Sequence, residues 1–195
     1  CILTNPLYMP NNSYAEAAAD YLDNCIHKQD SSGGMIECVI DGMPTGVGEP
    51  VFNKLDANLA RAVMSIGAVK GVEIGDGFAV TCAAGSSNND AFCADEGHIT
   101  KKTNHAGGTL GGISDGSRII LRAAVKPTPS ISQEQETVDQ EGKNTSLIIT
   151  GRHDPVIVPR AVVVVESMAA VTIADLLIAN LSSRMDYLEQ IYQRS

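Results

Sequence analysis

The sequence predicts an α+β fold in which a mostly antiparallel sheet packs against helices. Three segments alternate apolar and polar residues, as half-buried strands do: Met35 to Asp41, Val69 to Gly75 and Arg118 to Lys126. Segments with apolar residues at helical spacing lie before, between and after these strands. Strands joined by both hairpin-like and helical connections are typical of an α+β layer, with the helices on one face of the sheet.

The first two helices are predicted from helix formers and from apolar spacing. Ser13 to Lys28 carries strong helix formers behind a serine that can cap the N-terminus. The glycines of Asp30-Ser-Ser-Gly-Gly34 interrupt this pattern before the first strand. A second helix is expected between Gly48 and Ile66, where apolar residues recur at helical spacing: Phe52, Leu55, Leu59, Ala62, Val63 and Ile66.

The third strand is expected to bury one face, formed by Ile119, Leu121, Ala123 and Val125. A further short strand is expected at Leu147 to Thr150, before the last helix. This helix begins near Pro159 and is apolar nearly all round, so it is expected to be covered on both sides. The sheet can cover only one side of this helix, so a second layer, formed by residues outside this part of the fold, is implied. Because charged and polar residues interrupt Ala161 to Leu181, we interpret it as a buried helix and not as a membrane span.

Composition excludes several classes of function. The 195 residues are 44% hydrophobic and 19% charged, so the chain is expected to fold. A net charge of -9 argues against nucleic acid or an anionic membrane as the main partner. The five cysteines form no C-x-x-C pair, so neither a zinc ribbon nor a redox dithiol is indicated. Reduced thiols in a cytosolic protein are the expectation.

Two long polar segments, at about residues 81–117 and 127–146, show no periodicity and are expected to be mobile loops. Mobile surface loops without a function are one interpretation of both. The repeated glycines from Asn104 to Gly112 favour a function for the first segment, because glycine lets backbone N–H groups approach a ligand closely.

A row of cations gives a stronger indication of a site. Arg118, Arg122 and Lys126 are four residues apart and therefore share one face of the third strand. This positive stripe ends in Lys126-Pro-Thr-Pro-Ser130, where a lysine and two hydroxyls could hold a phosphate. The alternative is the solvated side of an edge strand. Gly151-Arg-His-Asp-Pro155 then places a cation, an imidazole and a carboxylate between Gly and Pro, which favours a site over a plain loop.

Several blocks of sequence, in order along most of the chain, resemble the chorismate synthase family. The family's amino-terminal blocks, including its Thr-Phe-Gly-Glu-Ser-His-Gly start, are absent, so the resemblance is to the carboxy-terminal half. It implies that residues 1–195 form a single unit, one half of a β-α-α-β layered sandwich. The matching blocks are Gly48 to Phe52, Lys54 to Ala57, Met64 to Ile66, Ala68 to Phe78, Thr103 to Gly108, Gly111 to Ser114, Lys126 to Thr128, Gly151 to Pro155 and Pro159 to Ala161.

The resemblance implies a lyase of the shikimate pathway, which serves aromatic amino acid biosynthesis. The family converts 5-enolpyruvylshikimate 3-phosphate to chorismate by anti-1,4-elimination of phosphate and a ring proton. It needs reduced FMN without net redox change, with NADPH as the associated reductant; whether flavin reduction is intrinsic stays open. A cytoplasmic homotetramer is implied, with no nucleic acid or membrane partner. The other hypothesis is a non-catalytic anion-binding and oligomerisation module that folds alone.

The resemblance also assigns residues. Asp154 matches an aspartate that works with flavin N5 in removing the proton. The flavin site matches Gly67-Ala68 (where Asn-Ala is common in the family), Gly111 and Arg152, together with Lys126, Pro127, Thr128, Pro129 and Ser130. The positive stripe is then expected to face the flavin phosphate and the anionic substrate. His153 is interpreted as structural, bridging its neighbours. The family's proton-donating histidines lie in its other half, so this chain alone is expected to be inactive.

Overall fold

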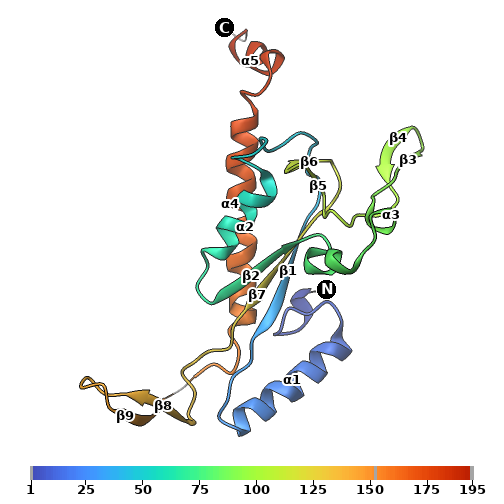
Figure 1. The fold of residues 1–195 in the computed structure, drawn as a ribbon. Helices are drawn as coiled ribbons and strands as arrows, with labels where there is room; N and C mark the ends of the chain where they lie inside the picture. Colours follow the sequence, from blue (N-terminus) through green and yellow to red (C-terminus); the bar gives the residue numbers. More distant parts are fainter. Residues whose placement is uncertain (1, 152, 194–195) are drawn as a thin grey trace. The chain divides into compact units, whose positions relative to one another are not determined.

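The computed structural model describes residues 2–151 and 153–193 (Figure 1). The chain forms two compact units. Unit 1 comprises Cys1–Ile36 with Ala124–Val163, and unit 2 comprises Glu37–Ala123 with Val164–Ser195. Three elements, β1 (Gly34–Ile40), β7 (Ile119–Val125) and α4 (Val158–Asn180), have residues in both units.

Unit 1 contains a short 3-10 helix η1 (Ile2–Thr4), the helix α1 (Asn12–His27) and a hairpin of β8 (Glu134–Val138) and β9 (Asn144–Ile148). The first helix is capped by the side chain of Asn11, which accepts hydrogen bonds from the backbone N–H groups of Ser13 and Tyr14. Ser13 therefore lies inside the first turn, and the sequence prediction of a serine cap is wrong. An Asn at this position satisfies the free N–H groups equally well.

The hairpin of unit 1 falls largely within the segment that the sequence predicted to be a loop. β8 and β9 pair antiparallel, from Glu134 opposite Ile148 to Val138 opposite Asn144. The strand β9 therefore begins at Asn144, three residues before the start of the short strand predicted from the sequence. All residues of β9 are exposed, and so are most residues of β8. A strand with no buried face has no reason to alternate apolar and polar residues, so the pattern could not reveal it.

The central feature of the fold is a three-stranded sheet of order β1-β7-β2, in which β2 spans Val69–Ile74. The strand β7 lies in the middle and buries alternate residues, as the sequence predicted: Ile119, Leu121, Ala123 and Val125. In β1 the buried residue is Ile36, with Cys38 and Ile40 half-buried on the same face. The three predicted strands are thus confirmed to within a residue or two at their ends.

The helix α2 of unit 2 (Leu55–Met64) packs on β2 and buries Leu55, Leu59 and Val63. The sequence placed its start too early, since Phe52 precedes the helix and is 89% exposed. The reason is the backbone before it: Gly46, Gly48 and Val51 have positive φ, which a right-handed helix cannot include.

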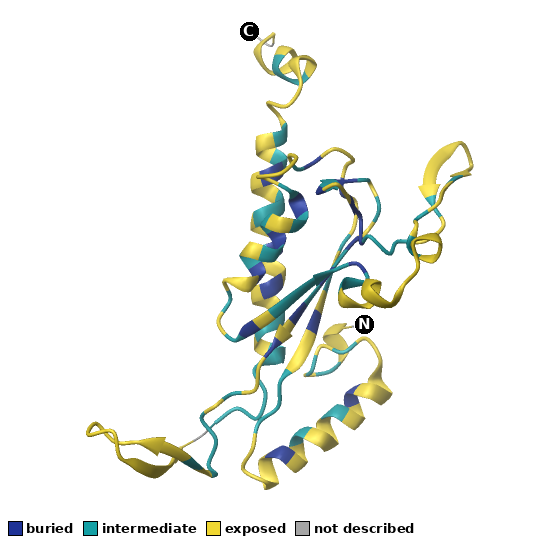
Figure 2. Ribbon diagram, viewed as in Figure 1, coloured by how far each residue is buried: buried dark blue, intermediate teal, exposed yellow. Residues whose placement is uncertain are grey.

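The long helix α4 is followed by α5 (Met185–Tyr192). Its buried residues, Val165, Ala169 and Leu176, form one stripe, whereas Val171 and Ile178 elsewhere on the helix are 67% and 69% exposed (Figure 2). Among the described residues, α4 is the helix whose length and apolar composition alone would suffice to cross a membrane. A helix apolar all round is normally covered on both sides. In this chain α4 buries only one stripe, in agreement with the sequence expectation of a missing layer.

The first long polar segment is also structured. It holds η2 (Gly77–Cys82), α3 (Gly85–Asn88) and two antiparallel hairpins. The first hairpin pairs β3 (Phe92–Asp95) with β4 (His98–Lys101), and the second pairs β5 (Thr109–Leu110) with β6 (Ile113–Ser114). Helices and antiparallel strands together confirm the α+β class.

Candidate functional site

Two of the segments predicted to bind the cofactor and to carry the chemistry meet at one pocket of unit 1. The pocket has a volume of about 240 Å³ and lies between the end of α1, residues 130–132 and the turn at 151–155. The predicted residues Ser130 and Asp154 both line it. Its polar lining comprises Gln29, Asp30, Ser31, Ser130, Ser132, His153 and Asp154. The structure thus brings a predicted phosphate-binding segment and the predicted catalytic carboxylate to the same cavity.

Hydrogen bonds hold these segments to the end of α1. The hydroxyl of Ser31 donates to the carbonyl of Thr128 at 2.6 Å, and the N–H of Ser32 donates to the carbonyl of Pro155 at 2.7 Å. The side-chain amide of Gln133 donates to the carbonyl of Lys28 at 2.8 Å. The pocket wall is therefore fixed mainly through backbone carbonyls.

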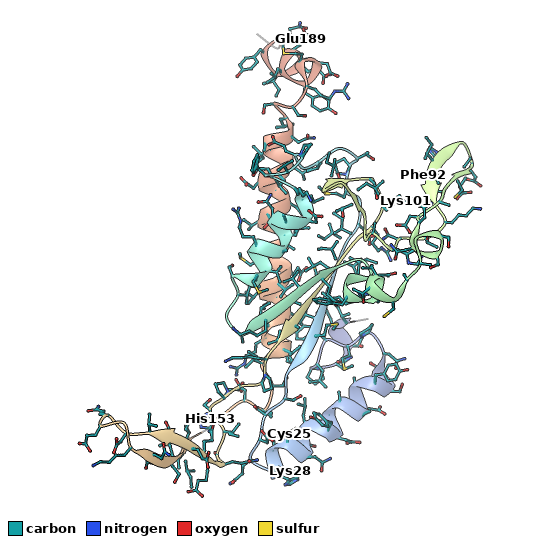
Figure 3. The ribbon with its side chains drawn as sticks, in the orientation of Figure 1. Cys25, Lys28, Phe92, Lys101, His153 and Glu189 are labelled. Carbon is teal, nitrogen blue, oxygen red and sulfur yellow. The ribbon has the colours of Figure 1, made fainter. Side chains whose placement is uncertain are left out.

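Two buried polar atoms of unit 1, Thr128 Oγ1 and His153 Nε2, lack a hydrogen-bond partner within the described part of the chain. His153, labelled in Figure 3, lines the pocket, and Thr128 lies two residues before the lining residue Ser130. Buried polar atoms are nearly always bonded in folded proteins, so such a pair indicates a missing water or ligand. The interpretation of His153 as a bridge between its neighbours stays a prediction, because its neighbour Arg152 lies outside the described residues.

The carboxylate of Asp154 forms an ion pair with Arg160 of α4, with 2.8 Å between Oδ2 and Nη1. The Asp154 side chain is 38% exposed and that of Arg160 is 78% exposed. An ion pair of such exposure contributes little to stability, about 0–1 kcal/mol. The predicted flavin residue Arg152 lies outside the described residues. Asp154 is thus a pocket-lining carboxylate whose observed partner is a solvent-facing arginine.

Three of the predicted flavin residues, Gly67, Ala68 and Gly111, lie in unit 2 and offer backbone rather than side chains. Gly67 and Ala68 form the turn between α2 and β2, and Ala68 has a left-handed φ of 70°. Gly111 lies in the two-residue turn between β5 and β6, where both central residues have positive φ, 60° and 86°. This conformation is the type I′ turn that favours a Gly-Gly pair. A Cβ added at Gly67 or Gly111 would meet no atom within 4 Å, so both turns are open to an approaching group.

The predicted positive stripe is largely neutralised. Arg118 Nε lies 2.6 Å from Asp41 Oδ1, and Arg122 Nε lies 2.8 Å from Glu37 Oε2. Arg122 also donates to the carbonyl of Gly75 at 2.8 Å. Carboxylates on and beside the neighbouring strand β1 therefore pair with these arginines, and that they face an anionic ligand stays a prediction. The edge-strand alternative is wrong, since β7 is central. Lys126, exposed beyond the strand, is the member of the stripe without an ion pair in the described residues.

A carboxylate that the sequence did not single out organises the glycine-rich segment. Asp90 accepts hydrogen bonds from the Thr103 hydroxyl at 2.7 Å and from the N–H groups of His105 and Ala106 at 2.8 and 3.0 Å. Burial acts to raise the pKa of Asp90, but these hydrogen bonds outweigh it and hold the pKa below its ordinary value. Asp76 then lies 2.6 Å from Nδ1 of His105.

The pocket residues Asp30 and Ser31 were also missed, because Asp30-Ser-Ser-Gly-Gly34 was interpreted only as the end of a helix. A cluster of small polar residues with glycine gives no periodicity. The position of this segment is what indicates a function. It joins α1 to β1, and β1 is adjacent to β7, the strand that leads into Lys126. Connections beside the ends of adjacent strands lie close together and often carry functional residues.

Comparison with known proteins shows the family to which this chain is similar. The sequence model of the chorismate synthase family matches residues 2–178. A chorismate synthase of Lachnoclostridium phytofermentans is 63% identical over 191 residues, which cover 97% of this chain and 52% of that protein. One of Methanococcus maripaludis is 51% identical over 176 residues, covering 90% and 47%. A crystal structure of chorismate synthase superimposes with a TM-score of 0.74 at 32% identity, covering 95% and 49% of the two chains.

These matches define first a class of protein, one with the α+β fold of a solved chorismate synthase. They also define the family. The chain belongs to the chorismate synthase family. It spans about half the length of the curated relatives it matches.

Proposed function

We propose that the protein to which this chain contributes converts 5-enolpyruvylshikimate 3-phosphate to chorismate with the help of reduced FMN. The observation that carries the proposal is the pocket where Ser130 and Asp154 meet beside the unpartnered His153 Nε2. Family membership supports the reaction, and the pocket supports the assignment of these residues to it.

The residues present fit a flavin. Thr128 Oγ1 is a buried hydroxyl left for a ligand, and Ser130 and Ser132 add two hydroxyls in the pocket wall. Hydroxyls and the Lys126 ammonium suit the oxygens of a phosphate, whereas the carboxylates of Asp30 and Asp154 suit O–H and N–H donors. The open turn at Gly111 offers backbone groups. We assign Lys126, Pro127, Thr128, Pro129, Ser130, Arg152, Gly111, Gly67 and Ala68 to the flavin site.

The chain's own residues then have defined tasks. A reduced flavin, when bound, supplies electron density that helps the phosphate leave, without net oxidation. Asp154 accepts the ring proton on a carboxylate oxygen as the C–H bond breaks. The electron pair of that bond forms a new double bond, the existing ring double bond shifts by one position, and the C–O bond to phosphate breaks with its electron pair leaving on the phosphate. Lys126 neutralises part of the developing phosphate charge. An exposed partner such as Arg160 leaves the carboxylate free to exchange that proton with solvent afterwards.

We further propose that the whole protein is a cytoplasmic homotetramer and that NADPH serves as the reductant of its flavin. The exposed apolar residues of α4, such as Val171 and Ile178, support burial of that helix against another part of the assembly. The chain's net charge of -9 supports a protein that avoids anionic surfaces.

The test is chorismate formation by the full-length protein under anaerobic conditions. With reduced FMN we expect one chorismate and one phosphate for each substrate molecule consumed, and none with oxidised FMN. Residues 1–195 alone should form little or none, because the family's proton donors are not among them. Absence of chorismate from the full-length protein with reduced FMN would refute the proposal.

A further inference from the structure

The loop between α1 and β1, residues 28–33, contacts both segments that form the pocket. We propose that this loop positions the cofactor-binding segment, and that Ser31 is a positioning residue which acts through Thr128. The inference rests on the proposed function, because it concerns the same site. It adds residues to which neither the family resemblance nor the sequence pattern gave a role.

Ser31 makes the shortest of these contacts. Its hydroxyl donates to the carbonyl of Thr128 at 2.6 Å, and its own N–H donates to the carboxylate of Asp30 at 2.8 Å. The Thr128 hydroxyl is buried without a partner in the described residues. Holding the Thr128 carbonyl fixes the orientation of its peptide, and with it the direction in which that hydroxyl points.

Thr128 depends on this contact because it lies between two prolines, Pro127 and Pro129. Neither proline has an N–H group, so this segment cannot be fixed by a backbone ladder of its own. The residue before a proline is already confined to extended conformations. One hydrogen bond to its carbonyl therefore removes most of the freedom that remains, and Ser31 supplies it.

The same loop holds the other segment and excludes side chains from the junction. The N–H of Ser32 donates to the carbonyl of Pro155 at 2.7 Å, one residue beyond Asp154. A Cβ at Gly33 would lie 2.5 Å from the carbonyl oxygen of Val125 and 3.1 Å from Cδ of Pro127. Gly33 is thus required for space, because the loop and the start of the cofactor-binding segment are in direct contact. A loop of six residues couples the two segments.

The test uses three variants of the full-length protein: Ser31→Ala, Ser31→Thr, and Ser182→Ala as a matched control. Ser182 makes the same kind of hydroxyl-to-carbonyl bond, 3.0 Å to Ala179, at the exposed end of α4. Three quantities are measured: the dissociation constant of FMN, the melting temperature, and hydrogen exchange at the backbone amides of Thr128 and Ser130–Ser132.

We expect Ser31→Ala to raise the FMN dissociation constant about 3- to 10-fold, the scale of one hydrogen bond, and to speed exchange at those amides. Its melting temperature should match that of Ser182→Ala, and Ser31→Thr should restore both readouts. Unchanged exchange in Ser31→Ala would overturn the inference, as would a failure of Ser31→Thr to restore FMN binding. Hydrogen exchange is measured without flavin, so it reports on the positioning of the segment and not on the reaction. The proposed function is refuted by a different result, the absence of chorismate from the wild-type protein, so the two failures can be told apart.

Discussion

The residues proposed to bind the flavin are of a different kind in each of the two units. Around Ser130 and Asp154 the chain offers side chains: hydroxyls, a carboxylate and an imidazole that line one pocket. At Gly67 and Gly111 it offers backbone, with open turns where an added Cβ would meet nothing. The difference predicts where substitutions act. Changes to the residues of unit 1 alter chemistry and affinity, whereas changes to those of unit 2 act through backbone conformation and have small effects.

The largest effect is expected from Asp154→Asn in the full-length protein. The change keeps the shape of the side chain but removes the base, so single-turnover chorismate formation should fall by about 10²–10⁴-fold. The dissociation constant of FMN should change much less, because Lys126 and the hydroxyls remain. Both are measured on one preparation, together with the melting temperature.

Arg160→Gln is the matched control, because it removes the observed partner of Asp154 and leaves the carboxylate. It should change stability by less than about 1 kcal/mol, as for exposed pairs, and leave turnover near normal. If Asp154→Asn behaves like Arg160→Gln, with normal turnover per bound flavin, the carboxylate has a structural role only.

Gly33→Ala should have the next largest effect. A methyl group there meets the Val125 carbonyl and must displace the loop or the cofactor-binding segment. We expect FMN affinity to fall by about 10-fold or more, on the scale of overpacking costs of about 1–3 kcal/mol. Gly85→Ala is the control, since a Cβ at Gly85 meets nothing within 4 Å. Equal FMN affinities of the two variants would show that the loop does not act on the site.

Asp90→Asn tests the glycine-rich segment before Gly111. The amide keeps only part of the hydrogen bonding of the carboxylate, so we expect a loss of about 2 kcal/mol in the free energy of unfolding at neutral pH. Because the pKa of Asp90 is lowered in the folded state, its contribution is present above the unfolded value of about 3.9 and is lost as the pH falls through the lower folded value. The difference between variant and wild type should therefore shrink below about pH 4. Urea unfolding at several pH values measures this, and a difference that does not depend on pH would contradict it.

The substitution Gly111→Ala should cost about 1 kcal/mol of stability, because alanine is strained at a φ of 60°. The space around the residue is open, so no steric cost is added. Thermal unfolding compared with that of Gly85→Ala checks this value. A cost near zero would show that the turn can change its conformation freely.

The smallest effect is expected at Gly67, where the family commonly has Asn. Gly67 has ordinary φ and open surroundings, so Gly67→Asn should change stability by less than about 0.5 kcal/mol. If the backbone of Gly67 binds the flavin, the dissociation constant of FMN should change less than about 3-fold, within the range of one weak hydrogen bond. A tenfold change in a titration with FMN would mean that a side chain at this position contacts the ligand.

The sequence predicted the sheet well and the loops poorly, for physical reasons. The alternation of Ile119, Leu121 and Ala123 reports burial on one face, and all three are buried. The hairpins β3–β4 and β8–β9 are largely exposed, so burial left no pattern in them. The start of α2 was misplaced because positive φ at a residue such as Val51 is set by surrounding turns and not by residue type.

For the site, the sequence identified segments but not partners. It selected the segment that ends at Ser130 for its lysine and hydroxyls, and Asp154 for its block's resemblance to a known family. Ser130 and Asp154 share a pocket. It could not show that Glu37 neutralises Arg122, since that contact joins residues 85 positions apart. Nor did it show that Ser31 holds Thr128, 97 positions away. Contacts of such separation depend on strand order and register, which no local pattern contains.

The most direct test of the central claim is a crystal structure of the full-length protein with FMN bound. The account predicts that the flavin lies within hydrogen-bond distance of the Thr128 and Ser130 hydroxyls, with the Asp154 carboxylate in contact with it. Flavin bound away from these three residues, with the Thr128 hydroxyl bonded to another group of the protein, would contradict the account.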